Sequence, residues 1–362
     1  MANILDFETV ALADDKDAIV IIDQTLLPGE TKLIELRTAK EIWDAIYLLQ
    51  VRGAPAIGVT AGFGIYILMK HTKAETFDEF MTEFKEKKDY LDSSRPTAVN
   101  LSWALNRMEQ LVLKVTDNGR NYNRQELITA MKNESEAIKA EDIEVCRRIG
   151  EYGLTLVKEG DGILTHCNAG KLCACKYGTA TAPIYLGHEK GYNFRVFCDE
   201  TRPLLQGARL TAYELHSAGI DTTVICDNMS ASVMQKGWVD AVFVGCDRVA
   251  ANGDVANKIG TSVVATVAAR YGVPFYVCAP TSTIDINTLT GADINIEQRE
   301  PMEVTEMWYE KRMAPEGVKV YNPAFDVTDN SLIAGIVTEY GILRAPYDKA
   351  IRELFEKKAA LK

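Results

Sequence analysis

The sequence is poor in positive charge. It has 40 lysines and arginines against 51 aspartates and glutamates, which gives a formal net charge of −11 over 362 residues. Proteins that bind nucleic acid or anionic lipid usually present a basic field, because phosphate groups must be neutralised. We therefore expect no nucleic-acid partner.

The sequence also lacks a long uncharged hydrophobic run. The longest extends from Gly58 to Met69 and is shorter than the roughly 20 residues that a membrane-spanning helix needs. The first residues include Asp6 and Glu8, where a signal peptide would carry basic charge. We expect no membrane association, no export and a location in the cytoplasm.

Cysteine is scarce as well: eight residues in the chain are too few for a disulfide-stabilised secreted fold. His166, Cys167, Cys173 and Cys175 lie close together, but structural zinc sites favour cysteine pairs with two to four residues between them, and Cys173 and Cys175 are closer. We expect no bound metal. Neither a Walker A loop nor a Gly-x-Gly-x-x-Gly motif occurs, so a nucleotide cofactor is not indicated.

The length favours two domains, because single hydrophobic cores rarely grow beyond about 250–300 residues. Residues 1–140 are expected to form a mainly helical N-terminal domain. Residues 17–36 are typical of a β-hairpin with its turn at Leu27-Pro28-Gly29-Glu30, and a capping box at Thr38 and Glu41 begins a helix. Further helical periodicity occurs at 56–70, 75–92, 98–115 and 123–158.

Residues 141–362 follow a different pattern. Short β-rich runs occur at 162–167, 194–198, 222–226, 241–246 and 274–279. Helical segments separate them, at 172–190, 203–218, 229–237 and 259–272. This alternation predicts an α/β domain built on a parallel sheet.

The residues that end these strands are chemically alike. Three runs end in Cys-Asp and two others end in His-Cys or in Cys-Ala; the residues are Cys198-Asp199, Cys226-Asp227, Cys246-Asp247, His166-Cys167 and Cys278. Ligands bind beyond the carboxyl ends of parallel strands, so these residues are candidates for a site. Each cysteine is more simply explained as a small apolar side chain, and each aspartate as a helix cap or an ion-pair partner.

Three segments offer groups that suit an anion. The small-residue turn after Cys167 leads into an expected helix start, where free backbone N–H groups attract phosphate. Asn257 and Lys258 precede another helix start at Thr261 and add an amide and a cation. The uncharged run after Arg52 fits either an arginine contact to phosphate or a tightly packed helix.

Five ordered motifs resemble methylthioribose-1-phosphate isomerase. They are Arg52-Gly-Ala-Pro-Ala-Ile-Gly, Arg95-Pro-Thr-Ala-Val-Asn-Leu, Cys167-Asn-Ala-Gly, Asp199-Glu-Thr-Arg-Pro-Leu-Leu-Gln-Gly-Ala-Arg209 and Gly245-Cys-Asp-Arg-Val-Ala-Ala-Asn-Gly-Asp-Val-Ala-Asn-Lys-Ile-Gly-Thr261. The resemblance covers nearly the whole chain. It implies an aldose–ketose isomerase of methionine salvage that converts 5-methylthioribose 1-phosphate to 5-methylthioribulose 1-phosphate without a cofactor.

The resemblance also implies a fold, an assembly and site residues. The fold is a Rossmann-like parallel-sheet C-terminal domain, residues 141–362, with a smaller, mainly helical N-terminal domain, and the assembly is a homodimer. Cys167 and Asp247 match the family's catalytic cysteine and catalytic acid. The positions that match its binding residues for the sugar phosphate are Arg52, Gly53, Ala54, Arg95, Gln206, Asn257 and Lys258.

The implied chemistry gives these residues specific tasks. The anomeric oxygen carries phosphate, so the sugar ring must open while positive charge builds at C1. We expect a protonated Asp247 to deliver its proton to the ring oxygen, with Val244, Cys246 and Val249 as apolar surroundings that raise its pKa. Cys167 would then either remove the C2 proton or shield a direct hydride shift from C2 to C1. The cations among the binding positions would hold the phosphate.

Three alternatives stay open. 5-Deoxyribose 1-phosphate lacks only the methylthio group, and an apolar pocket separates such substrates weakly. A ribose-1,5-bisphosphate isomerase, from the same superfamily, would need further basic residues facing C5. A regulatory binding subunit without catalysis, also found in that superfamily, would not need Cys167 and Asp247 together.

Overall fold

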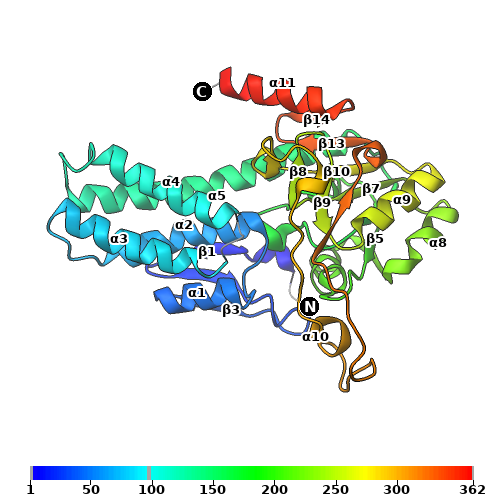
Figure 1. The fold of residues 1–362 in the computed structure, drawn as a ribbon, viewed down its shortest axis with the longest axis horizontal. Coiled ribbons are helices and arrows are strands. Elements are labelled where there is room, and N and C mark those ends of the chain that lie inside the picture. The colour runs from blue at the N-terminus through cyan, green and yellow to red at the C-terminus, as the bar shows by residue number, and fades with distance from the viewer. Residues whose placement is uncertain (1–2, 96–98, 361–362) are drawn as a thin grey trace. The chain divides into compact units, whose positions relative to one another are not determined.

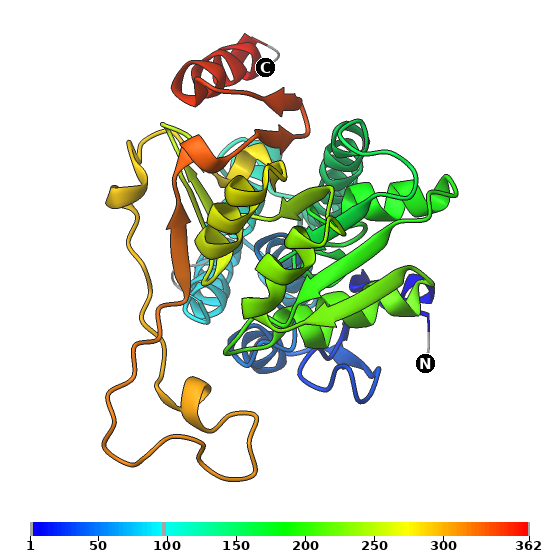
Figure 2. The ribbon, with the colours of Figure 1, turned by 90° about the vertical axis from the view of Figure 1, so that its right-hand side faces the viewer.

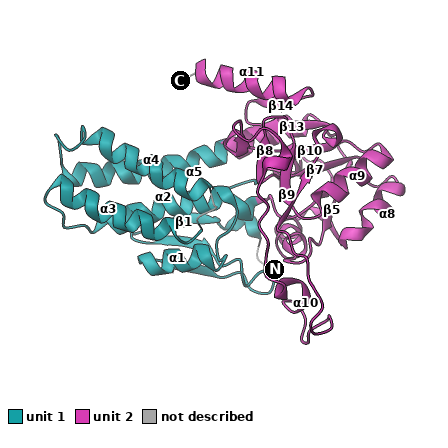
Figure 3. Ribbon diagram, in the orientation of Figure 1, with its two compact units in different colours: residues 1–144, 171–178 teal, residues 145–170, 179–362 magenta. Residues whose placement is uncertain are grey.

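The computed structural model describes residues 3–95 and 99–360, which fall into two compact units (Figure 3). Unit 1 comprises residues 1–144 and 171–178, and unit 2 comprises residues 145–170 and 179–362. The expected division after residue 140 lies near this boundary. The segment 171–178 differs from the expectation, because it belongs to the helical unit and not to the sheet unit.

Long-range hydrogen bonds hold segment 171–178 in unit 1. Thr9 Oγ1 donates to the Lys171 carbonyl at 2.8 Å, and Gln24 Nε2 donates to the Leu172 carbonyl at 2.7 Å. Cys175 donates its N–H to the Asp142 carboxylate at 2.7 Å, and its side chain is buried in the core of unit 1. These partners are distant in the sequence, so the local pattern does not reveal the attachment.

Unit 1 contains a small antiparallel sheet. Its strands are β1 (Val10–Leu12), β2 (Ile19–Ile22) and β3 (Leu33–Leu36), in the order β1-β2-β3. The expected hairpin is therefore present as β2 and β3, with one more strand beside it. Its helices (Figure 1) are α1 (Ala39–Tyr47), α2 (Ala54–Lys70), α3 (Phe77–Asp92), α4 (Val99–Val115) and the first part of α5 (Arg124–Leu154).

Helix α2 forms the centre of unit 1. Nearly all of its side chains from Ala56 to Met69 are buried. A Cβ atom at Gly58 would lie 3.1 Å from the carbonyl oxygen of Asn100, and one at Gly64 would lie 3.2 Å from Ile42 Cγ2. Helices α4 and α1 thus approach α2 closely at its glycines. The tightly packed helix that the sequence after Arg52 allowed is what the structure contains.

Unit 2 is built on a seven-stranded sheet in the order β14-β13-β10-β7-β4-β5-β6. The strands are β4 (Gly162–Thr165), β5 (Arg195–Asp199), β6 (Asp221–Ile225), β7 (Ala241–Val244), β10 (Phe275–Cys278), β13 (Gly335–Thr338) and β14 (Gly341–Leu343). All neighbouring pairs are parallel except β13 and β14. In chain order, the five strands from β4 to β10 have the 3-2-1-4-5 arrangement of a Rossmann-like sheet, which confirms the expected fold class.

Helices cover both faces of this sheet (Figure 2). Val242 and Val244 of β7 share a buried cluster with Val233 of α8 (Ser230–Gln235) and Val264 of α9 (Thr261–Tyr271). Phe243 points to the other face, because the side chains of a strand alternate, and lies close to Gly153 of α5. The near-continuous hydrophobic strands of the sequence are explained by this double cover.

A second sheet of unit 2 has the order β11-β8-β9-β12. Its strands are β8 (Arg248–Ala250), β9 (Val255–Lys258), β11 (Ile284–Asp285) and β12 (Phe325–Thr328). Between β11 and β12 the chain makes a long excursion that carries the short helix α10 (Met302–Thr305), and α11 (Tyr347–Ala360) follows β14 (Figures 1 and 2).

Two of the expected helices are shorter than the sequence suggested. The segment 172–190 contains only the 3-10 turn η2 (Lys171–Cys173) and α6 (Ala182–Glu189), since Tyr177 and Gly178 both have positive φ angles, of 66° and 73°. The segment 203–218 begins as the π-helix η3 (Gly207–Thr211) and continues as α7 (Ala212–Ser217).

Among the described residues, no helix is both long enough and apolar enough to cross a membrane.

Candidate active site

The carboxyl ends of the central strands bring the candidate residues of unit 2 together. Cys167 follows β4 and Asp247 follows β7, and these two strands are neighbours in the sheet. β5 and β6 lie on one side of β4 in the sheet, and β7, β10 and β13 lie on the other, so the strand order reverses between β4 and β7. Ligands of open parallel sheets bind at such a switch point.

The turn after Cys167 passes directly over the end of β7. A Cβ atom at Gly245 would lie 2.5 Å from the Ala169 Cβ atom, so only glycine allows this approach. Cys167 is 8% exposed and has a positive φ of 66°, a left-handed conformation that is uncommon for residues other than glycine. The cysteine is thus held in a defined place beside the β7 loop.

Asp247 begins the hairpin of β8 and β9. Its N–H donates to the Ala256 carbonyl at 2.9 Å. Val244 and Val249 are fully buried and Cys246 is half-buried, as expected, but the side chain of Asp247 itself is exposed. The expectation that these neighbours bury the carboxyl is therefore wrong, because strand residues flanking a turn can be buried while the turn residue projects outward.

Asn257 and Lys258 end β9, the second strand of the same hairpin. Asn257 is 5% exposed and donates from Nδ2 to Thr261 Oγ1 at 3.1 Å. The ammonium of Lys258 lies 4.8 Å from the centre of the Phe325 ring. Asp247, Asn257 and Lys258 therefore share one short hairpin beside the carboxyl edge of the sheet.

The start of α9 is already occupied by a carboxylate. Asp326 accepts from the N–H groups of Gly260 at 2.8 Å and Ser262 at 3.1 Å, and from the Ser262 hydroxyl at 2.8 Å. The expectation that this helix start offers its N–H groups to a phosphate is wrong, because Asp326 comes from a distant strand and caps the helix first.

Gln206 lies just before η3, on the loop that follows β5. Its side chain is 6% exposed, and its Oε1 atom is buried with no hydrogen-bond partner among the described residues. Buried acceptors are normally paired, so an unpaired one calls for a specific explanation. A ligand hydroxyl group would supply the missing donor.

The remaining candidates belong to unit 1. Arg52 and Arg95 are partly exposed, and Ala54 is exposed at the first position of α2. Gly53 is the N-cap of α2 with a φ of 88°, and a Cβ atom there would lie 2.3 Å from Cys173 Cβ. Only glycine can hold this conformation against the segment 171–178.

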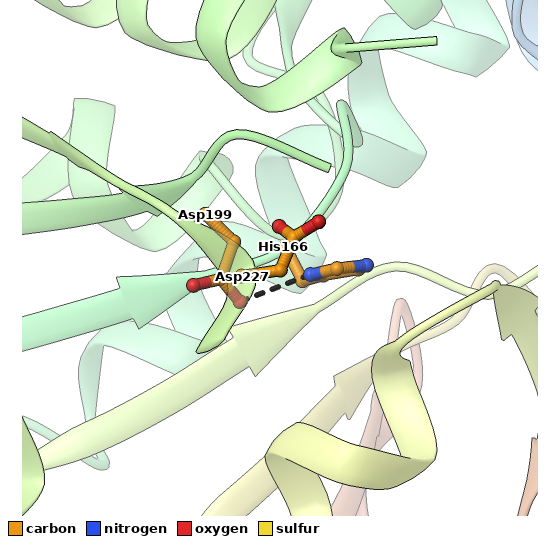
Figure 4. A group of neighbouring side chains, drawn as sticks. All are labelled: His166, Asp199 and Asp227. Carbon is orange, nitrogen blue, oxygen red and sulfur yellow. Dashed lines mark hydrogen bonds and ion pairs between the residues drawn. The ribbon is translucent and has the colours of Figure 1, made fainter. Parts of the chain in front are cut away.

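His166, which precedes Cys167, lies in a group with two further strand-end aspartates, Asp199 and Asp227 (Figure 4). His166 and Asp199 are buried and Asp227 is half-buried. His166 Nδ1 is 2.9 Å from Asp199 Oδ2, and His166 Nε2 is 2.9 Å from the Ile259 carbonyl. A carbonyl oxygen can only accept, so Nε2 carries a hydrogen atom. A second proton is then shared between Nδ1 and Asp199.

Burial raises the pKa of Asp199 to about 6, against the opposing effect of His166. Burial alone would lower the pKa of His166, but the hydrogen bond and the attraction from Asp199 outweigh it and raise that pKa. Both groups therefore hold protons more tightly than in an unfolded chain.

The same group contains the donor atoms that could hold a metal ion. Single ligand atoms of His166, Asp199 and Asp227 lie within 4.8 Å of one another. The ring nitrogens of His166 already have partners, and both oxygens of Asp227 accept backbone N–H groups. The His166 ring and the Asp227 carboxylate thus have partners within the protein, whereas Asp199 Oδ1 is buried with no hydrogen-bond partner among the described residues. The zinc candidates Cys173 and Cys175 belong to unit 1, and His166 belongs to unit 2.

Four other cysteines are largely shielded from solvent and unreactive. Burial raises the pKa of Cys246 to about 12 and also raises those of Cys175, Cys198 and Cys278. A thiol with a raised pKa carries little nucleophilic thiolate. For these cysteines, the interpretation as small apolar side chains is the better one.

Comparison with known proteins identifies the family. The model of the initiation factor 2 subunit family matches residues 50–345. The chain belongs to this family.

Three of the proteins that resemble the chain over nearly its whole length are named as isomerases. A methylthioribose-1-phosphate isomerase of Symbiobacterium thermophilum is 63% identical, with 97% of each chain covered. A 5-deoxyribose 1-phosphate isomerase of Petrotoga mobilis is 56% identical over 96% of this chain and 99% of the relative. The crystal structure of 5-methylthioribose 1-phosphate isomerase from Pyrococcus horikoshii OT3 superposes with a TM-score of 0.90 at 42% identity, covering 96% of both chains. These relatives confirm the resemblance indicated by the sequence motifs.

Proposed function

We propose that the protein is an aldose–ketose isomerase that converts 5-methylthioribose 1-phosphate to 5-methylthioribulose 1-phosphate, as in methionine salvage. The 63% identity with a relative of that name supports the reaction. The observation that carries it in the structure is the placement of Cys167 and Asp247 after the two strands that flank the switch point of the sheet. A regulatory subunit would have no use for this pair.

We assign substrate binding to groups that suit a sugar phosphate. The buried, unpaired Oε1 of Gln206 would accept a hydrogen bond from a sugar hydroxyl. The start of α2 has no side-chain cap at Gly53, and the positive end of the helix favours an anion next to Arg52 and Ala54. Arg95 and Lys258 would add charge, and Asn257 would fix the orientation.

The reaction can be written with atoms balanced. Asp247 donates its proton to the ring oxygen as the bond from C1 to that oxygen breaks. The thiolate of Cys167 then removes the proton from C2, and the electron pair of that bond forms a double bond between C1 and C2 and neutralises the positive charge at C1. Cys167 returns the proton to C1 while the C2 hydroxyl loses its proton to the Asp247 carboxylate, which leaves a ketone at C2 and both residues in their starting forms. In the alternative route, the hydrogen moves from C2 to C1 as hydride, the C2 hydroxyl again loses its proton to Asp247, and Cys167 shields the path. Since Asp247 is exposed in the free chain, the bound sugar has to supply the desolvation that keeps its carboxyl protonated.

The specific rival substrate is 5-deoxyribose 1-phosphate. The Petrotoga mobilis relative, named for that activity, is 56% identical to this chain. The two sugars differ only at C5, so we expect the protein to turn over both, with the methylthio sugar preferred.

The decisive experiment compares kcat/KM for the two sugar phosphates on the purified protein.

Asp247→Asn should lower kcat by about 10²–10⁴-fold while KM stays within a few-fold, because general acid catalysis is lost and binding is kept. Asp221→Asn is the control, because Asp221 is exposed at the opposite, amino end of β6. Absence of turnover of either sugar by the wild-type protein would refute the proposed function, and near-normal kcat in Asp247→Asn would remove this residue from the mechanism.

Isomerisation in D2O separates the two routes. Deuterium at C1 of the product indicates that the proton exchanges with solvent through a base. Its absence favours the hydride shift or a shielded base.

We further propose a homodimer in the cytoplasm. The family resemblance supports the dimer, and eight cysteines without a disulfide fit a reducing compartment. Sedimentation velocity at micromolar concentration tests the assembly, since a monomer across the whole concentration range would exclude the dimer. Fractionation of native cells tests the location, and recovery outside the cytoplasm would refute it.

A further inference from the structure

The left-handed backbone of Cys167 needs support from its surroundings. Its φ is 66°, and it lies at the end of β4 with a nearly buried side chain. Residues other than glycine adopt this conformation only when neighbouring groups hold them there, and such residues gather at functional sites.

Two buried threonine hydroxyls bracket the Cys167 backbone. The N–H of Cys167 donates to Thr201 Oγ1 at 2.8 Å, and Thr211 Oγ1 donates to the Cys167 carbonyl at 2.6 Å. Thr201 and Thr211 are both 0% exposed. The two peptide groups of the cysteine are therefore fixed by side chains from the loop after β5 and from η3.

Thr201 is itself held in an unusual conformation. Its φ is 65°, which is rare for a β-branched residue. Its hydroxyl donates to the Asp199 carbonyl at 3.1 Å, which leaves the hydroxyl oxygen to accept the N–H of Cys167. The side chain of Thr201 can act on Cys167 only while its own backbone keeps this conformation.

Asp227 provides that restraint. Its two carboxylate oxygens accept the N–H groups of Thr201 and Arg202, each at 2.7 Å. Short hydrogen bonds to an ionised carboxylate are among the stronger ones in proteins. Asp227 follows β6, so hydrogen bonds connect three adjacent strand ends in series, from β6 through the loop of β5 to Cys167 after β4 (Figure 4 shows Asp227 beside the His166 and Asp199 pair).

We propose that Thr201 and Asp227 are positioning residues that hold the Cys167 thiol in its reactive orientation. The inference rests on the proposed function, since Cys167 is the group taken to act at C2 of the sugar. Thr201 acts directly on the cysteine backbone, and Asp227 acts through Thr201. Neither residue is assigned to contact the substrate.

The test uses Thr201→Val, which keeps the shape of the side chain and removes both hydrogen bonds of the hydroxyl. Displacements of about 1 Å at a reacting group can cost about 10²-fold in rate, so kcat should fall about 10–100-fold while KM stays within about threefold. Thr201→Ser keeps the hydroxyl and should retain most of kcat. Asp227→Asn presents an amide N–H₂ to a backbone N–H and should lower kcat in the same way.

A second measurement reports on Cys167 itself and is independent of turnover. Iodoacetamide labelling is followed at the Cys167 peptide by mass spectrometry, in a Cys226→Ser background that removes the exposed thiol. Release of the backbone should speed labelling of Cys167 at least about threefold in Thr201→Val and Asp227→Asn, and leave it unchanged in Thr201→Ser. Wild-type labelling and kcat in Thr201→Val would overturn the proposal.

Thr116→Val is a matched control for the general effect of removing a buried threonine hydroxyl. Thr116 is also 0% exposed, and its hydroxyl donates to the Val112 carbonyl at 2.8 Å and accepts the Gly119 N–H at 3.2 Å. Thr116→Val should leave kcat and Cys167 labelling unchanged. If Thr201→Val does not fold, Asp227→Asn alone tests the proposal. A wild-type kcat and a wild-type rate of Cys167 labelling in Asp227→Asn would then contradict it.

The two hypotheses fail in different ways. If Cys167→Ser retains normal kcat, the catalytic role of Cys167 is wrong, yet labelling still tests whether Thr201 and Asp227 hold the cysteine. If Cys167→Ser is inactive and labelling is the same in all variants, the catalytic role stands and the positioning role is wrong.

Discussion

Replacing Gly170 by alanine should destabilise unit 2 strongly. Gly170 ends the turn that begins at Cys167, and a Cβ atom there would lie 1.4 Å from Oε1 and 2.4 Å from Cδ of Glu214. A carboxylate at the end of a flexible side chain often moves aside, but Glu214 is 0% exposed and lies on α7. The methyl group and the carboxylate cannot both keep their places.

The magnitude follows from two costs. Overpacking of a dense core costs about 1–3 kcal/mol. Moving a buried polar group away from its partners costs about 1–3 kcal/mol, and more when the group is charged. We expect a loss of about 4 kcal/mol, which for a cooperative unit of this size corresponds to a fall in Tm of about 8–16 °C.

Scanning calorimetry measures this change against a matched glycine. A Cβ atom at Gly29 would come no closer than 3.5 Å to its nearest neighbour, Leu26 O, so Gly29→Ala should leave Tm nearly unchanged. Glu214→Ala removes the obstacle, so the double variant Gly170→Ala with Glu214→Ala should be as stable as Glu214→Ala alone. Equal Tm values for Gly170→Ala and Gly29→Ala, or additive losses in the double variant, would refute the steric explanation.

Two further predictions concern His166 and its neighbours. Because the pKa of Asp199 is raised to about 6 from 3.8 and that of His166 is raised from 6.5, folding takes up protons. The stability from this pair is therefore present at low pH; the Asp199 part is lost as pH rises from 3.8 through about 6, and the His166 part is lost above 6.5. Urea midpoints between pH 5 and 8 should fall more steeply in the wild type than in Asp199→Asn; parallel curves would contradict this. Gly260→Ala should cost more stability than Gly272→Ala, since both have positive φ angles, of 102° and 71°, but only at Gly260 would a Cβ atom meet the His166 ring, at 2.9 Å. Each should lose at least about 1 kcal/mol to backbone strain, and equal Tm values would exclude a steric contribution from His166.

Much of the fold follows from local sequence pattern. Most of the short apolar runs from residue 162 onward are strands that are fully or largely buried between helices, whereas β6 lies at the edge of the sheet and is mostly exposed. Most of these runs end in a polar residue, which marks the carboxyl end of the strand. The pattern alone therefore places Cys167, Asp199, Asp227 and Asp247 at the carboxyl ends of the parallel strands. The order of the strands depends on long-range pairing, which local pattern does not encode. The sequence therefore does not predict that Cys167 and Asp247 follow two adjacent strands.

The candidate site was less predictable in its details. Asp326 caps α9 from β12, a strand that is distant in the sequence. Nothing in the sequence near Thr261 indicates that a carboxylate already accepts hydrogen bonds from the start of this helix. Thr201 and Thr211 are ordinary residues in sequence terms, and their hydrogen bonds to Cys167 depend on a positive φ at Thr201 that the local sequence does not specify. The exposure of Asp247 likewise depends on how its hairpin leaves the sheet.

The raised pKa values of three strand-end thiols have a consequence for resistance to oxidation. Oxidants attack thiolates far faster than thiols, so Cys198, Cys246 and Cys278, with their raised pKa values, should stay reduced when the cell is under oxidative stress. Cys226 is exposed on the same edge of the sheet and is the thiol that reagents meet first. The carboxyl edge of the sheet can therefore contain several cysteines while exposing little reactive thiol to peroxide.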